Sequence, residues 1–159
     1  MMQTNILDYI DITTERVPDK IAFANDDYAL TFAEFKDKAM REASYLCSEK
    51  VYNSPILVFM SKSPNLLSAI FGVVYSGNYY VPIDSEMPRQ RIELIIKNTH
   101  ADYMICDEEN IKAAEDFSFD GKLVNFADCS QFGILDEDLK YKKLVLDKFL
   151  RELLCRIEA

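Results

Sequence analysis

VYSGNYYVPID at residues 74–84, followed by MPRQRI at residues 87–92, is the stretch of sequence that decides the fold. Gly77 ends a helical pattern, and the β-prone residues that follow it predict a short buried strand with a Pro-containing edge. Pro88 favours the first turn of the next helix, because its missing N–H is not needed there. Helix, strand and helix in this order are the repeating unit of an α/β fold.

The same alternation continues on both sides of this stretch. Residues 56–59 lie in a continuous apolar run, which is typical of a central strand that is covered on both faces. Residues 103–106 and 123–126 predict two more strands, with a short helix after Asp107 between them. We therefore expect an α/β fold with a mainly parallel sheet and right-handed crossover helices, in which residues 56–59 are parallel to 79–83 and 103–106.

Capping residues mark the start of the two long helices before this stretch. Thr31 and Glu34 have the spacing of a capping box, in which each side chain binds a backbone amide of the other residue. Ser63 followed by Pro64 combines a cap with proline at the first helical position.

A small unit at the N-terminus precedes the sheet. Asn5 can cap a first helix, and residues 21–24 and 28–31 predict a hairpin. Residues on the expected buried faces are Ile6, Tyr9, Ile10, Thr13 and Val17 in the first helix, and Phe32, Phe35, Ala39, Ala43 and Leu46 in the second. Their three- and four-residue spacing indicates amphipathic helices.

The last segment, residues 139–159, predicts a C-terminal amphipathic helix. Its apolar face carries Leu139, Leu146, Leu150, Leu153 and Ile157. We expect this face to be buried, either against the sheet of the same chain or in a homodimer. The alternative is an exposed interaction surface. Residues 1–138 then form one domain, and residues 139–159 form a helical tail.

Composition excludes several classes of function. The chain has 159 residues, of which 49% are hydrophobic, and a formal net charge of −9. An acidic chain without a basic stripe is not expected to bind nucleic acid or an anionic membrane. The sequence shows no signal peptide and no membrane span, and Cys47, Cys106, Cys129 and Cys155 form no C-x-x-C pair. We expect a cytoplasmic protein with free thiols.

Three polar triplets follow predicted strands, where α/β proteins bind ligands. They are residues 61–63, residues 84–86 and residues 107–109. Lys62 could meet a phosphate, Asp84 a ribose or a metal, and the acids of the last triplet a divalent cation. The structural alternatives, namely a solvated lysine, a turn and a helix N-terminus, are favoured in each case.

The sequence assigns no catalytic, cofactor-binding or metal-binding residue. The glycines are isolated, so neither a dinucleotide fingerprint nor a phosphate-binding loop is present. His100 is the only histidine, and no serine or cysteine stands in a recognisable nucleophile setting.

Two ordered motifs resemble those of amino-acid adenylation domains among the adenylate-forming enzymes. LTFAEF at residues 30–35 resembles their first core motif, L-(T/S)-(Y/F)-x-E-L, and YSGNYYVPID at residues 75–84 resembles the second. PDKIAF at residues 18–23 resembles the segment that precedes the first motif. The chain looks most like D-alanine–D-alanyl carrier protein ligases and the adenylation domains of nonribosomal peptide synthetases, over residues 5–138.

The resemblance implies a reaction that this chain is not equipped to perform alone. In the family, ATP and Mg²⁺ convert a carboxylic acid to an acyl-adenylate, and the phosphopantetheine thiol of a carrier protein then takes the acyl group. The phosphate loop of the S-G-T-T-G-x-P-K-G type and the late lysine have no matching position here. We therefore expect the N-terminal part of an amino-acid-activating ligase, inactive by itself, whether it arose by truncation, by a frameshift or as a piece of a longer protein. The amino acid is not specified by these motifs.

Two alternatives remain open at the level of sequence. One is a non-catalytic interaction module that pairs through the face of residues 146–157. The other is a small α/β binding domain that uses Asp84 or Asp107 at the strand ends.

Overall fold

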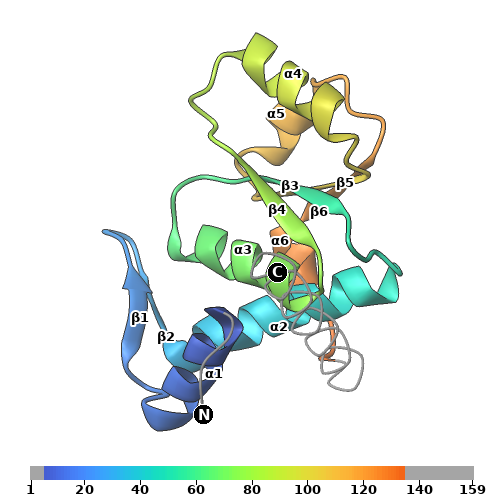
Figure 1. Cartoon of the computed structure of the whole chain (residues 1–159). Coiled ribbons are helices and arrows are strands. Elements are labelled where there is room, and N and C mark those ends of the chain that lie inside the picture. The colour runs from blue at the N-terminus through green and yellow to red at the C-terminus, as the bar shows by residue number, and fades with distance from the viewer. Residues whose placement is uncertain (1–5, 135–159) are drawn as a thin grey trace, which may run out of the picture.

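The computed structural model describes residues 6–134, which alternate between strands and helices (Figure 1). The elements in chain order are α1 (Ile6–Arg16), β1 (Ile21–Ala24), β2 (Ala29–Thr31), α2 (Phe32–Ser48), β3 (Pro55–Phe59), α3 (Pro64–Tyr75), β4 (Tyr79–Ile83), α4 (Arg89–Thr99), β5 (Tyr103–Cys106), α5 (Ile111–Glu115), β6 (Lys122–Asn125) and α6 (Phe126–Cys129). The predicted α/β class is confirmed.

A four-stranded parallel sheet in the order β4-β3-β5-β6 forms the centre of the described chain. In the pairing, Ile56 of β3 lies opposite Tyr80 on one side and Tyr103 on the other. β3 is therefore the central strand parallel to both neighbours, as its apolar run predicts. The chain moves from β3 outward to β4 and then crosses back to β5, so the direction of winding reverses between β3 and β5.

Helices cover both faces of this sheet. Figure 1 shows α4 and α5 on one side of the strands and α2, α3 and α6 on the other. Successive residues of β3 point to the hydrophobic cores on opposite faces of the sheet. Val58 belongs to the core between the sheet and helices α2 and α3, and Leu57 packs with Ile92 and Ile96 of α4. This alternation explains why the strand is apolar throughout, because both of its faces are buried.

The helix starts follow the sequence closely. The Glu34 amide donates to Thr31 Oγ1 at 3.2 Å, and the Thr31 amide donates to Glu34 Oε2 at 2.9 Å, which completes the capping box. Ser63 Oγ accepts from the Leu66 amide at 3.3 Å, next to Pro64 at the start of α3. Both predicted caps are confirmed.

The predicted burial of α1 is wrong for two of its residues. Ile6 and Tyr9 are 57% and 55% exposed, the other three predicted positions are half-buried, and the buried residue of this helix is Leu7. Leu7 packs with Ala39 and Ala43 of α2. Because α1 packs mainly against α2, only a narrow face of α1 is buried in the contact between the two helices. The apolar residues on the opposite face of α1 are exposed to solvent.

Two boundaries also differ from the sequence analysis. β6 begins at Lys122 and ends at Asn125, one residue earlier than expected. A short helix, α6, follows it and was not predicted. The predicted apolar face of residues 139–159, and Cys155 within it, lie outside the described residues. In the part from 6 to 134, no helix is both long and apolar enough to cross a bilayer.

The strand β4 lies at one edge of the sheet. Gly77, with a φ of 78°, ends α3 in the left-handed region and turns the chain into this strand. The Tyr79 amide donates to the Ser54 carbonyl at 3.2 Å, which fixes the pairing with β3. Pro82 is exposed within the same strand.

Candidate functional site

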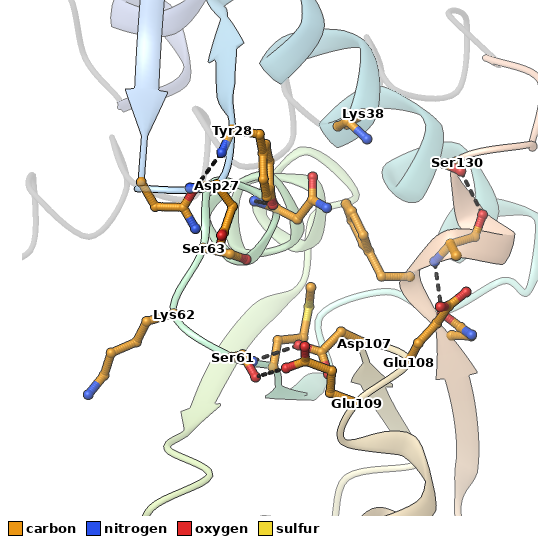
Figure 2. Close-up of a pocket in the computed structure, with 16 residues that line it drawn as sticks. Asp27, Tyr28, Lys38, Ser61, Lys62, Ser63, Asp107, Glu108, Glu109 and Ser130 are labelled. Carbon is orange, nitrogen blue, oxygen red and sulfur yellow. Dashed lines mark hydrogen bonds between the residues drawn. The ribbon is translucent and has the colours of Figure 1, made fainter.

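A cavity of about 410 Å³ opens at the carboxyl end of the sheet, next to the point where its winding reverses. Loops after β3, β5 and β6 line it, and the β1–β2 hairpin and α2 close its upper wall (Figure 2). In open α/β sheets, ligands bind in the crevice outside the carboxyl ends at such a switch point. Position therefore makes this cavity, the switch-point cavity, the first candidate for a functional site.

The first and third of the polar triplets meet at its floor. The Ser61 amide donates to Asp107 Oδ2 at 2.7 Å, and Ser61 Oγ donates to Glu109 Oε2 at 3.0 Å. Asn110 Nδ2 donates to Ser61 Oγ at 2.9 Å and to Asp107 Oδ1 at 2.7 Å. We call Ser61, Asp107, Glu109 and Asn110 the β3–β5 clasp, because these hydrogen bonds join the loops after the two strands.

The second triplet takes a different part. Lys62 Nζ lies 3.2 Å from Asp84 Oδ2 and 3.9 Å from Glu86 Oε2, and the Lys62 side chain is 76% exposed. Asp84 Oδ1 accepts from the Glu86 amide at 3.0 Å, and this amide together with Lys62 lowers the pKa of Asp84. Figure 2 shows Lys62 turned away from the other labelled side chains. The triplet thus forms a turn and an exposed ion pair beside the cavity.

The upper wall comes from the hairpin and the start of α3. Asn25 Oδ1 accepts from the amides of Asp27 and Tyr28, which shapes the hairpin turn. The Tyr28 hydroxyl accepts from the Asn65 amide at 3.3 Å and so ties the hairpin to α3. Lys38 of α2 also lines this wall. The sequence predicts the hairpin but assigns none of these residues to a site, because nothing in the local pattern shows that the hairpin reaches the sheet.

The side near β6 is formed by α6. Asn125 Oδ1 accepts from the Ala127 amide at 2.9 Å and caps this helix. Ser130 Oγ donates to the Ala127 carbonyl at 2.6 Å. Asn125 is the one signal in the sequence that could have revealed α6, because asparagine is a preferred N-cap.

Residues 6–134 show neither a cluster of metal-binding side chains nor a glycine-rich phosphate loop at this cavity. Within residues 6–134, no group of three His, Cys, Asp or Glu side chains could hold a metal ion. Asp107 and Glu109, the acids proposed for a cation, already accept hydrogen bonds in the clasp. Among the described residues that line the cavity there is no glycine, so it offers no glycine-rich cradle of amides for phosphates.

The single histidine lies elsewhere. His100 follows α4 in the left-handed conformation, with a φ of 50°, and ends that helix. It is not among the residues that line the switch-point cavity.

Comparison with known proteins identifies the family. The model of the family "AMP-binding enzyme" matches residues 10–147. The D-alanine–D-alanyl carrier protein ligase of Listeria monocytogenes serovar 1/2a is 34% identical over 110 residues, which are 68% of this chain and 22% of the ligase. A mycosubtilin synthase polypeptide of Bacillus subtilis is 29% identical over 118 residues, which are 74% of this chain and 4% of that polypeptide.

Solved structures share the fold. A four-domain nonribosomal peptide synthetase bound to AMP and glycine superposes with a TM-score of 0.74 at 18% identity, over 88% of this chain and 10% of that one. The chain spans 22% of the length of the first ligase above, and its match to the family model covers most of its own length. The chain therefore belongs to the AMP-binding enzyme family.

Proposed function

We propose that this chain forms the N-terminal part of an ATP-dependent, AMP-forming ligase that activates an amino acid and passes it to a carrier protein. The observation that carries the proposal is the family match over residues 10–147. The names of the relatives, a D-alanine–D-alanyl carrier protein ligase and a mycosubtilin synthase, support an amino acid as the substrate and a carrier thiol as the acceptor.

We also propose that the 159-residue chain alone does not form acyl-adenylates. Stabilising charge on a transferring phosphate needs a phosphate loop, Mg²⁺ and a lysine. The sequence has no such loop, and no glycine is among the described residues that line the switch-point cavity. ATP, Mg²⁺ and the phosphopantetheine arm would engage the part of the ligase that has no counterpart in this chain.

Pyrophosphate exchange tests the inactivity directly. The purified chain is incubated with ATP, Mg²⁺, labelled pyrophosphate and either D-alanine or a panel of other amino acids. We expect no exchange above a control without protein, while a full-length D-alanine–D-alanyl carrier protein ligase in parallel gives a strong signal. Amino-acid-dependent exchange by the chain would contradict the proposal.

A chimaera tests the family role. Residues 10–134 replace the corresponding segment of the Listeria ligase, and D-alanine-dependent exchange is measured. We expect activity to be retained, because the described residues supply the sheet and its helices and the host supplies the chemical groups. A matched chimaera carrying Val58→Asp should lose activity through misfolding. A folded parent chimaera without exchange would overturn the role.

A further proposal concerns the C-terminal residues 139–159. We propose that residues 139–159, of which 139–147 fall within the family match, form a helix. Its face with Leu146, Leu150, Leu153 and Ile157 would be buried in the chain or in a homodimer. Removing residues 139–159 should then lower solubility by uncovering an apolar patch. Light scattering and urea unfolding of the two lengths decide this, and a truncated chain that is equally soluble, monomeric and stable would exclude it.

The location proposed for the ligase is the cytoplasm. Cys106 and Cys129 are buried free thiols, which agrees with a reducing compartment. The alternative of a free-standing binding domain has less support, because both acids that it would use have partners: Asp84 pairs with Lys62, and Asp107 belongs to the clasp.

A further inference from the structure

An acidic side chain is buried where three helices meet, on the face of the sheet opposite α4 and α5. Glu42 lies in the middle of α2 and has an exposed fraction of 0%. α3 and α6 pack beside α2 on this face (Figure 1). We call the contact formed by Glu42, Gly72 of α3 and Cys129 of α6 the helix seam.

Gly72 brings α3 unusually close to this carboxyl group. A Cβ atom at position 72 would lie 2.9 Å from both Cβ and Cδ of Glu42, and 2.9 Å from the carbonyl oxygen of Ala39. The Glu42 side chain therefore rests directly on the backbone of α3. With one side closed by backbone, the carboxyl group has little freedom to reach solvent while the helices stay packed.

Neither oxygen of the carboxyl group has a partner among the described residues. Within residues 6–134, Oε1 and Oε2 of Glu42 accept no hydrogen bond. An unpaired carboxylate in an apolar interior is costly, so such a group keeps its proton instead. Burial raises the pKa of Glu42 well above its ordinary value of 4.5.

The neighbouring titratable groups do not compensate this acid. On α3 the candidate is Tyr75, whose hydroxyl donates to Asp11 at 2.7 Å. On α6 they are Asp128, which is exposed, and Cys129, which is buried and whose pKa is raised by burial and by Glu42.

The bases on α2 do not compensate it either. Lys36 pairs with Asp11 at 2.9 Å and Arg41 with Asp37 at 2.7 Å, while Lys38 lines the switch-point cavity. No salt bridge in the described part of the chain includes Glu42.

We propose that Glu42 is a pH-sensitive latch between α2, α3 and α6: its carboxyl group is neutral while the helix seam is closed, and its ionisation opens the seam. Opening would move α6, whose cap Asn125 and following Ser130 line the switch-point cavity. Arg41 donates to the carbonyl of Phe132 at 3.0 Å, so the segment after α6 is also held to α2. The state of one carboxyl group would thus set the shape of that cavity.

The direction of the effect follows from proton linkage. The closed seam holds a proton that the open seam releases, so raising the pH above the ordinary pKa of the carboxyl favours the open form. The opening constant should rise about tenfold per pH unit until the pKa of the closed form is reached.

Hydrogen–deuterium exchange on the full chain measures this opening. Protection factors of amides in α3 and α6, corrected for the pH dependence of chemical exchange, are compared between pH 5.5 and pH 7.5. We expect up to about a hundredfold loss of protection in the wild type, because two pH units separate the conditions. Glu42→Gln has nearly the same shape but no proton to release, and its protection should change less than twofold.

A control variant and a second measurement test whether Glu42 itself causes the pH dependence. Asp128→Asn removes the other carboxyl group of the seam region and should leave the wild-type slope intact. An unchanged slope in Glu42→Gln, or no slope in the wild type, would overturn the latch. If Glu42→Gln does not fold, the side-chain carbon-13 titration of Glu42 is measured in the folded wild type instead. A titration midpoint near pH 4.5 would also overturn the latch.

Discussion

Two sets of buried or half-buried acids in this protein are treated in opposite ways. Asp107 in the β3–β5 clasp accepts hydrogen bonds from the Ser61 amide and from Asn110. Glu42 in the helix seam has no donor within the described residues. In the clasp, hydrogen-bond donors surround the carboxyl group, which joins two loops. In the helix seam the carboxyl group lacks such donors, so its packing depends on its proton.

A carboxyl group introduced into the core of the sheet should destabilise the chain far more than Glu42 does. Val58→Asp places a short acid in the central strand, where Val58 has an exposed fraction of 0%. We expect a loss of roughly 4–5 kcal/mol or more in the free energy of unfolding, which would unfold most small domains. Circular dichroism and urea unfolding measure it. A folded variant with wild-type stability would show that the sheet core is not dry.

Removing the acid of the helix seam should stabilise the chain, more so at high pH. The pKa of Glu42 is raised in the folded state, so stability falls as the pH rises from 4.5 toward the folded-state pKa. Glu42→Met fills the space without a charge and should gain about 1–3 kcal/mol at pH 8 and much less near pH 5. Urea unfolding at both pH values checks the sign, and a gain that is independent of pH would point to packing alone.

Removing the acid of the clasp should have the opposite sign. Asp107→Ala strands the amides of Ser61 and Asn110, both of which donate to its carboxylate. We expect a loss of about 1–2 kcal/mol, because these loops are only partly buried and water replaces some bonds. Glu108→Ala is the matched control, since Glu108 is an exposed neighbour. Equal effects of the two variants would mean that the clasp adds no stability.

A methyl group at Gly72 should loosen the helix seam. Gly72→Ala would press on the Ala39 carbonyl and on Glu42, at a cost of about 1–3 kcal/mol for overpacking. Better helix propensity returns about 1 kcal/mol, so we expect a net loss of about 1 kcal/mol. Gly133→Ala, whose Cβ would meet nothing within 4 Å, serves as the control and should lose no stability. If Gly72→Ala is as harmless as the control, α3 does not hold Glu42 in place.

The sheet was predictable because its signals are local. The apolar run of β3, the glycine stop before β4 and the caps at Thr31 and Ser63 each depend on a few consecutive residues. The burial of α1 was not predictable in the same way. Leu7 is buried because it packs against α2, and the apolar pattern of α1 alone does not show which of its faces meets that helix.

The candidate site was predictable in its parts but not in its assembly. The sequence named the triplets after the strands, yet the bond between Ser61 and Asp107 joins residues 46 positions apart, which no local pattern encodes. Glu42 was missed for another reason. It stands between Ala39 and Leu46 on the buried stripe of α2, but a glutamate on a helix is ordinarily assigned to the solvent side.

Pro82 lies in β4, the edge strand of the sheet that the described residues form, and limits the addition of a further strand there. Because the Tyr79 amide points to β3, the amide positions of Tyr80 and Pro82 face away from it along the outer side of β4. A proline there has no hydrogen to donate, so a strand added at this edge could receive a hydrogen bond from the amide of Tyr80 but none from Pro82. Because β4 is short, the loss of this one donor weakens edge-to-edge pairing between copies of the chain.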